Sequence, residues 1–286
     1  MGHKGLTTAV GVICQKNYFL YMVAFAYFLS QAGIFLIKGG YLKMPLGAFA
    51  GLDVLSLTIA AFVHGIRRYG TIKMFVFFVI TLVVSWCMES ASIAYGFPFG
   101  DYYYSDFLVP KLGAVPIIIM PAYFSMGYIS WIIGLILTGH FDKKFSGSAL
   151  FTVPVISAFL MTSYDLCFDP VASTILKHWT WRDGGYYFGV PYMNFLGWYL
   201  TVYIIFQLFA YYLLKSPQDE PVNTGKEFDW VFPVLIFFIT GLNFLFTPLI
   251  ANDNPDIHHS LSLVTLFTMI FSSILAYINV RTKFDK

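Results

Sequence analysis

Eight apolar segments of about 20 residues recur along this chain, and they limit its fold more than any other feature. They lie at about residues 18–37, 46–63, 72–94, 116–138, 149–168, 192–214, 230–250 and 261–280. A helix of this length spans the hydrocarbon layer of a membrane. The alternating strands of an outer-membrane barrel are missing from the sequence. We therefore predict an all-α polytopic transmembrane helix bundle of about eight spans, with seven as the alternative, forming one integral membrane domain over residues 1–286.

The composition agrees with this fold and excludes other classes of protein. Hydrophobic residues make up 58% of the chain and charged residues 11%, whereas soluble domains carry about 25% charged residues. Basic residues occur singly or in pairs between the spans, which argues against nucleic-acid binding. Three scattered cysteines (Cys14, Cys87 and Cys167) are too few for a disulfide or zinc framework. The expected partners are the lipid bilayer and a hydrophobic substrate.

The basic residues also predict an orientation. With eight spans, the N-terminus, the even-numbered loops and the C-terminus lie on one side and hold 12 of the 17 Lys and Arg residues. Positive charge favours the cytoplasmic side, so both termini are expected in the cytoplasm of a prokaryotic cell, with the protein in the plasma membrane. Two aromatic loops, 95–115 and 170–191, then lie on the other side.

The stretch 85–111 carries the most unusual chemistry in the chain. Glu89 lies near the end of an apolar span, and a carboxyl group within a bilayer costs roughly 2.5–3.5 kcal/mol on insertion scales. Thr81, Ser85, Glu89 and Ser92 share one helical face, and so do Thr162, Asp165 and Asp169 on another span. Asp53 lies about two turns inside its span, and Asn194 opens another from the same side. The alternative is that these groups only satisfy one another inside the bundle.

Such a cavity favours acid chemistry on a hydrophobic substrate. A carboxyl group that loses its solvation among aromatic rings favours its neutral form and can act as a general acid. Aromatic faces stabilise a nearby cation by about 0.5–2 kcal/mol. Protonation of an alkene in an isoprenoid, followed by capture of the carbocation, fits both features. This reasoning selects isoprenoid or terpenoid chemistry but no particular substrate.

Other functions remain open from the residues alone. Asp165 and Asp169 have the spacing with which membrane prenyltransferases hold magnesium diphosphate, and Lys111, Lys177 and Arg182 could bind the phosphates. Intramembrane acids also serve proton-coupled transporters. His258 and His259 near Asp253 and Asp256 could bind a metal, but adjacent histidines point in different directions on a helix, and a plain turn before the last span explains them better.

Several motifs resemble the carotenoid 1,2-hydratase family of integral membrane proteins, which includes bisanhydrobacterioruberin and γ-carotene hydratases. The resemblance covers about residues 85–200. It rests on Glu89, the stretch 98–111 (Pro-Phe-Gly-Asp-Tyr-Tyr-Tyr-Ser-Asp-Phe-Leu-Val-Pro-Lys), residues 165–172 and the stretch 187–198. Two departures are the run of three tyrosines and Val109, where a glycine is expected. The polar residues that the resemblance carries over are Glu89, Asp101, Tyr104, Lys111, Asp165, Asp169 and Asn194.

The resemblance implies a hydro-lyase of carotenoid biosynthesis. It would add water to the terminal C1,2 double bond of a linear or monocyclic carotenoid, and it would need neither a redox cofactor nor a metal. From the physical argument, Glu89 is the expected proton donor, and Asp165 or Asp169 is expected to position water. The expected substrate-binding residues are Asp53, Asp101, Tyr103, Tyr104, Lys111, Trp181, Asn194 and Trp198.

Overall fold

The computed structural model describes residues 17–141, 145, 147–216 and 226–285. The helices of the bundle are α2 (Asn17–Lys38), α3 (Leu46–Tyr69), α4 (Thr71–Tyr95), α5 (Ile119–Leu137), α6 (Ala149–Asp169), α7 (Tyr192–Lys215), α8 (Glu227–Phe246), α9 (Pro255–Thr265) and α10 (Phe271–Phe284). Three short helical turns extend them: η1 (Pro170–Ile175) after α6, η2 (Thr247–Leu249) after α8, and η3 (Leu266–Ile270) between α9 and α10. The described residues hold eight helical segments long and apolar enough to cross a membrane, which confirms the predicted all-α bundle.

Helix α5 lies at the centre of the bundle. Apolar residues occur on every side of it and most of its side chains are buried, as expected of a central helix. It packs against α3, α4, α6, α8 and α10. Around it, contacts between neighbours run from α2 to α3, α4, α7, α6, α9, α8 and back to α2. The other spans therefore form a ring around α5, and polar groups on their inner faces meet near its ends.

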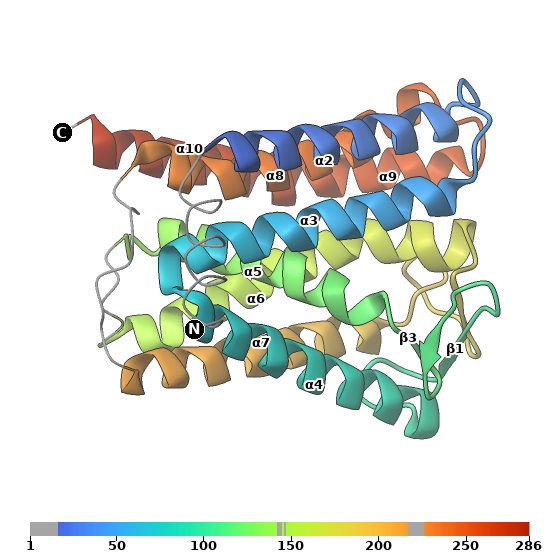
Figure 1. Cartoon of the computed structure of the whole chain (residues 1–286). Coiled ribbons are helices and arrows are strands. Elements are labelled where there is room, and N and C mark those ends of the chain that lie inside the picture. Colours follow the sequence, from blue (N-terminus) through green and yellow to red (C-terminus); the bar gives the residue numbers. More distant parts are fainter. Residues whose placement is uncertain (1–16, 142–144, 146, 217–225, 286) are drawn as a thin grey trace, which may run out of the picture.

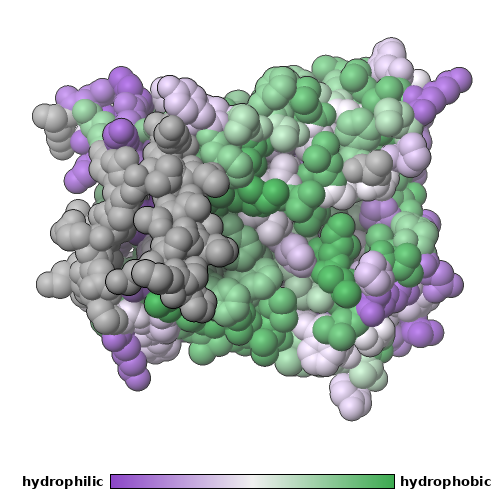
Figure 2. Space-filling model, in the orientation of Figure 1, coloured by the Kyte–Doolittle hydropathy of each residue, from purple (hydrophilic) through white to green (hydrophobic). Residues whose placement is uncertain are grey.

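The polar and apolar surfaces agree with a membrane location. Exposed Phe, Leu and Ile side chains cover the outer faces of the ring helices, for example Phe25 on α2, Phe75 on α4 and Phe267 on η3. In the view of Figure 2 an apolar band occupies the middle of the molecule, and hydrophilic residues gather at both ends. Figure 1 shows β1 and β3 at one end, here called the aromatic end, and the end of α10 at the opposite end.

The two aromatic loops join in a small sheet over the aromatic end. Strand β1 (Tyr102–Tyr104) pairs antiparallel with β4 (Trp179–Trp181), with Tyr102 opposite Trp181 and Tyr104 opposite Trp179. A second pair, β2 (Lys111–Leu112) with β3 (Val115–Pro116), shapes the first loop. Because Val115 and Pro116 belong to β3, α5 begins at Ile119 and not at residue 116 as predicted. The loops thus form one connected cover.

Helix α3 continues beyond the predicted end of its span at residue 63. The reason is that the polar residues that follow are satisfied within the bundle at the opposite end. Arg67 forms an ion pair with Asp229 at 2.9 Å, and Arg68 lies over the ring of Trp230 at 4.0 Å. His64 hydrogen-bonds to the hydroxyl of Tyr128 at 2.7 Å. Lys4, Lys16, Lys143, Lys144 and Lys286, which count toward the predicted orientation, lie outside the described residues.

Two other boundaries differ because a proline can occupy the first turn of a helix, where its missing N–H is not needed. The sequence places a loop after Asp169, but Pro170 begins the wide turn η1, which continues the path of α6 to Ile175. Similarly, α9 begins at Pro255, with Asn254 before it in a left-handed conformation. His258 and His259 therefore lie on a helix and not in a loop.

Candidate functional site

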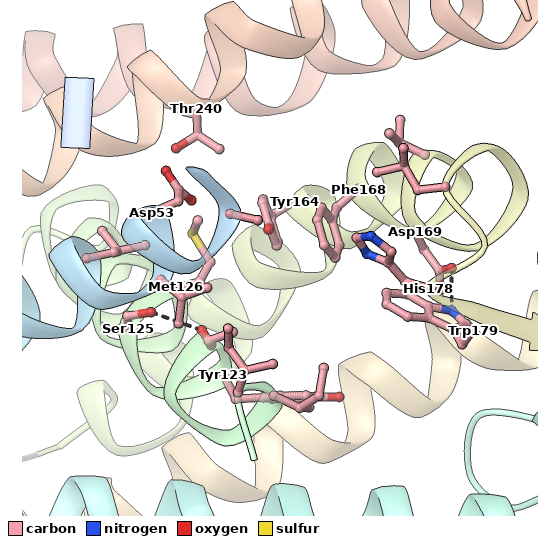
Figure 3. A pocket seen from close by; sticks show the side chains of 18 of the residues that line it. Asp53, Tyr123, Ser125, Met126, Tyr164, Phe168, Asp169, His178, Trp179 and Thr240 are labelled. Atoms are coloured by element: carbon pink, nitrogen blue, oxygen red, sulfur yellow. Dashed lines mark hydrogen bonds between the residues drawn. The ribbon is translucent and has the colours of Figure 1, made fainter. Parts of the chain in front are cut away.

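A cavity of about 220 Å³ lies between the helices α2 to α8 and the two aromatic loops, at the aromatic end of the bundle. Most of its wall is apolar or aromatic. Seven of the residues predicted from sequence line it: Asp53, Glu89, Tyr104, Asp169, Trp181, Asn194 and Trp198. Figure 3 shows Asp53 and Thr240 on one side and Asp169 with Trp179 on the other, with Tyr164 and Phe168 between them. The polar groups form two separate clusters.

The first cluster centres on Glu89, whose side chain is buried and receives three tyrosine hydroxyls. Tyr102 and Tyr104 both donate to Oε2, the latter at 2.8 Å, and Tyr123 donates to Oε1 at 2.9 Å. Two of these tyrosines come from β1 and the third from α5. The loop is held over α4 by Ser92, whose hydroxyl accepts from Phe99 N at 3.0 Å and donates to Gly100 O. Glu89 is thus surrounded by phenols.

Asp165 and Asp169, one helical turn apart on α6, are bridged by Asn194 and lie next to the phenols of Glu89, because Trp179 contacts the ring of Tyr104 at a centroid distance of 5.8 Å. The Asn194 amide nitrogen donates to Asp165 Oδ2 at 3.0 Å and to Asp169 Oδ2 at 2.6 Å. Trp179 Nε1 donates to Asp169 Oδ1 at 3.1 Å. Asp165 is fully buried and does not line the cavity, and its Oδ1 has no hydrogen-bond partner among the described residues. We call Glu89, Asp165, Asp169 and these partners the acid cluster.

The acid cluster contains three carboxyl groups and no described lysine or arginine within ion-pair distance. Removing an ion from water without a counter-ion costs several kcal/mol even after relaxation. Three anions so close together would also repel one another. The cluster therefore favours keeping at least one proton, as carboxyl pairs in other active sites do. A proton held in this way is available to a substrate in the cavity.

Aromatic rings surround the same cluster. Because side chains alternate along a strand, Tyr102 and Tyr104 face inward from β1, and Trp179 and Trp181 do so from β4. The ring centroids of Tyr102 and Trp181 are 4.8 Å apart. Tyr123 stacks on Trp198 with a centroid distance of 4.4 Å and an interplanar angle of 9°. The cavity thus offers several π faces next to its acids.

The loop residues near the cavity have strongly perturbed protonation equilibria. Burial, followed by the nearby Glu89, raises the pKa of Tyr102 and of Tyr104 well above the ordinary tyrosine value. Both phenols therefore keep their protons and can donate to Glu89. Burial lowers the pKa of His178, whose imidazole also lines the cavity. His178 is accordingly neutral near pH 7.

Three predicted binding residues lie outside the cavity. Tyr103 is the middle residue of β1, and alternation turns it outward, where it is 46% exposed beneath the guanidinium of Arg182. Asp101 is exposed and pairs with Arg182 at 2.9 Å. Lys111 donates to Tyr104 O and lies 3.8 Å from Asp106. These three residues support the loops, and the structure brings none of them to the cavity wall.

The second polar cluster forms the opposite wall and includes Asp53. Lys38 Nζ donates to Asn243 Oδ1 at 3.1 Å, Asn243 Nδ2 donates to Gln31 Oε1 at 3.0 Å, and Gln31 Nε2 donates to Asp53 Oδ1 at 2.7 Å. Ser30 Oγ also donates to Asp53 Oδ1, at 2.8 Å. We call this chain from Lys38 through Asn243 and Gln31 to Asp53 the amide relay. It joins a cation to an anion through two side-chain amides.

Several cavity residues were missed in the sequence. Tyr102 could have been found from the alternation of a strand, once the two loops were expected to pair. Gln31 and Asn243 are polar residues inside apolar spans, and that alone marks them as candidates. Tyr123, Tyr164 and His178 carry no comparable signal, because aromatic residues are common throughout this chain.

No group of three or more His, Cys, Asp or Glu side chains within the described ranges has a metal-binding arrangement. In the segment weighed as a metal site from the sequence, His258 Nε2 lies 3.6 Å from Asp253 Oδ1. His258 is buried and His259 is exposed, so the two imidazoles point in different directions. Adjacent residues on a helix do not face one another.

A family model described as "Carotenoid biosynthesis protein" matches residues 49–253. The chain therefore belongs to this family of membrane proteins, and its role is in carotenoid biosynthesis, with a hydrophobic isoprenoid substrate. The match includes α3 to α8, which provide the acid cluster and most of the cavity wall. No curated protein and no solved structure gives a significant match.

Proposed function

We propose that this protein is a carotenoid 1,2-hydratase, a hydro-lyase that adds water to the terminal C1,2 double bond of a linear or monocyclic carotenoid. The observation that carries the proposal is the acid cluster: three carboxyl groups without a nearby cation, surrounded by aromatic rings in an apolar cavity. A site of this kind supplies a proton to an alkene and stabilises the cation that results.

In the proposed reaction a proton from the acid cluster is added to C2, and the π electrons form the new C2–H bond. The positive charge then lies on C1, where two methyl groups and the chain make it a tertiary cation. The oxygen of water adds to C1, and loss of one proton from that oxygen gives the tertiary alcohol. One water is consumed, no electrons are exchanged, and no redox cofactor is required.

Glu89 is the proposed proton donor, because it lies in the cavity wall within the shell of phenols. A hydroxyl group both donates and accepts. When Glu89 carries a proton, one phenol turns so that its oxygen accepts that proton, and the other two continue to donate. The proton can reach C2 from Glu89 itself or through that phenol. Tyr123 on Trp198, with Trp181 beside Tyr102, provides the ring faces for the cation.

The size of the cavity supports a substrate that enters by one end. Pockets for drug-sized ligands measure about 300–1,000 Å³, and this cavity of about 220 Å³ is smaller. The terminal part of a carotenoid fits this space, and the remaining polyene would lie in the bilayer. Ile118 lines the cavity and is 39% exposed, so we expect the cavity to open to the surface beside it.

The two alternatives from the sequence gain no support from the site. A prenyltransferase must bind a diphosphate, but Lys111, Lys177 and Arg182 do not line the cavity. Asp165 and Asp169 are instead bridged by Asn194. A transporter needs a route to the opposite end, yet none of the described lining residues comes from the network of His64 and Arg67 there.

The test is the pigment profile of a lycopene-producing strain that expresses the protein. Wild type is expected to convert the linear carotene to its 1-hydroxy derivative, and Glu89→Gln to lower that conversion by about 1,000-fold, since general acids contribute 10²–10⁴-fold. Glu227→Gln, at the opposite end and paired with Arg281, is the matched control with wild-type conversion. Full conversion by Glu89→Gln would overturn the assignment of the donor, and no hydroxylated product from wild type would overturn the proposed function.

A further inference from the structure

The amide relay is a polar wall that the proton-donating step does not use. Asp53 and Thr240 lie across the cavity from Asp169 and Trp179 (Figure 3). The relay comes from α2, α3 and α8, whereas the acids come from α4 and α6 and their partners from α5, α7 and the loops. The relay and the polar side chains next to it comprise seven residues: Tyr27, Ser30, Gln31, Lys38, Asp53, Thr240 and Asn243. So much polarity within apolar spans calls for a function.

Every hydrogen bond of the relay runs in one direction. The ammonium of Lys38 donates to Asn243, Asn243 donates to Gln31, and Gln31 donates to Asp53. Each amide dipole is therefore aligned from the cation toward the anion, and hydrogen bonds in such a chain strengthen one another. The relay holds one positive and one negative charge, so Asp53 is stabilised as a carboxylate without losing its place in the cavity wall.

One carboxylate oxygen of Asp53, Oδ2, also remains available to bind a ligand. Ser30 and Gln31 both donate to Oδ1, and among the described residues no donor reaches Oδ2. Asp53 is only partly buried and lines the cavity. Lys38 likewise lines the cavity and uses one of its three N–H groups on Asn243. A water molecule can donate to a free carboxylate oxygen while its own oxygen stays directed into the cavity.

The acids across the cavity are less suited to hold this water. Each oxygen of Asp169 already accepts from the protein, and both oxygens of Glu89 accept from tyrosines. Asp165 does not line the cavity. The nucleophilic water is therefore better placed on Asp53 of the relay than on Asp165 or Asp169, which the sequence analysis selected for it.

We propose that Asp53, oriented by the amide relay, binds the nucleophilic water and accepts its proton as the water attacks C1. This rests on the proposed hydration. The acid cluster donates a proton to C2 from one side of the double bond, and water reaches C1 from the other, so the addition is anti. Asp53 gains the proton that leaves the water oxygen, the acid cluster has lost one, and exchange with bulk water restores both.

The experiment separates the two half-reactions with purified protein in D2O and a linear carotene. Wild type is expected to form the alcohol with one carbon-bound deuterium at C2. In Asp53→Asn the cation still forms but is not captured, and it returns to an alkene by losing the original C2 hydrogen or a hydrogen of a C1 methyl group as a proton, so the added deuterium stays on C2. Alcohol formation should fall by about 100-fold, while the recovered alkene gains deuterium. Glu89→Gln should lose both alcohol and deuterium incorporation.

Asn243→Leu interrupts the relay without changing Asp53. It should also lower alcohol formation while the recovered alkene gains deuterium, but to a smaller degree. Asp106→Asn, an exposed carboxylate in the first loop, is the control with wild-type behaviour. Asp53→Asn with a wild-type rate of alcohol formation would overturn the role of Asp53. Loss of alcohol and deuterium together in both relay variants would overturn it as well, because the relay would then serve only the structure.

A third arm uses only wild type, so it does not depend on the folding of a variant. With one terminal methyl group labelled with ¹³C, hydration in D2O makes both C1 and C2 stereogenic. Their relative configuration is expected to correspond to anti addition, and a syn product would overturn the placement of water opposite the acids. Wild type that forms neither alcohol nor deuterated alkene would instead refute the proposed function itself.

Discussion

The acid cluster and the amide relay face the same cavity, but they favour opposite protonation states of their carboxyl groups. The acid cluster gathers Glu89, Asp165 and Asp169 with no cation, so it favours a bound proton. The amide relay pairs Asp53 with Lys38 through two amides, so Asp53 is favoured as an anion. In the proposed reaction, one wall therefore donates a proton and the other accepts one. Carboxyl groups of the same chemical type acquire different roles from the charges around them.

The largest effect is expected when the acid cluster loses its bridge. Asn194→Leu removes both hydrogen bonds that bridge Asp165 and Asp169. A buried hydrogen-bonding group that loses its partner costs about 1–3 kcal/mol, and two are lost here, so the unfolding midpoint in detergent should fall clearly, and conversion should fall by more than about 100-fold. Asn252→Leu, exposed at the same end, is the control. An unchanged midpoint and rate in Asn194→Leu would mean that the bridge contributes nothing.

A second change makes the relay resemble the acid cluster. Lys38→Met removes the cation from the relay, so Asp53 is no longer balanced and favours its protonated form. A hydrogen bond to a charged group contributes about 1.5–3 kcal/mol, which corresponds to a decrease in hydration of about 10- to 100-fold. Lys43→Met, exposed in the loop after α2, should leave the rate unchanged. Equal rates in both variants would contradict the charge pairing.

A smaller effect is expected from one phenol of the acid cluster. Tyr123→Phe removes one of the three hydroxyls on Glu89 but keeps the ring that stacks on Trp198. The rate should fall by about tenfold, in keeping with the loss of one hydrogen bond worth about 0.5–1.5 kcal/mol. Tyr128→Phe, one to two turns further along α5 and bonded to His64, is matched in burial and should lose stability but not activity. Loss of activity in Tyr128→Phe with unchanged activity in Tyr123→Phe would contradict the role of Tyr123 beside Glu89.

The smallest effect concerns pH and stability. Because burial lowers the pKa of His178 below its unfolded value of 6.5, the unfolded chain binds a proton more readily than the folded protein. Stability is then complete above about pH 6.5 and decreases as the pH falls further. His178→Gln should weaken this decrease. Unfolding midpoints of both proteins between pH 7.5 and 5.5 provide the measurement, and identical slopes would contradict it.

The sequence was sufficient to predict the helix bundle and the helix faces that carry the acids. It was insufficient to predict the amide relay on the opposite wall of the cavity. Apolar runs and helical spacing predict the spans and the shared face of Thr81, Ser85 and Glu89, all of which are buried on α4. Such patterns depend only on neighbours within one helix. The relay instead joins Lys38, Asn243 and Asp53 from three helices, and its geometry depends on how α2, α3 and α8 pack.

The two aromatic loops show the same limit of sequence-based prediction. Clustered Tyr and Trp residues predict an aromatic cover, but the choice of which ring faces inward depends on the register between β1 and β4. That register places Tyr102 inside and Tyr103 outside. A slip of one residue would exchange them. Three consecutive tyrosines give no local signal for either arrangement, so only the paired strands decide.

Isotope incorporation tests the central claim most directly. Purified protein is given a linear carotene in H2¹⁸O and, separately, in D2O, and the product is analysed by mass spectrometry. Hydration by acid catalysis predicts a tertiary alcohol with one ¹⁸O in the first case and one carbon-bound deuterium in the second, with both signals lost in Glu89→Gln. A product without ¹⁸O, or one enlarged by a prenyl unit, would contradict the account.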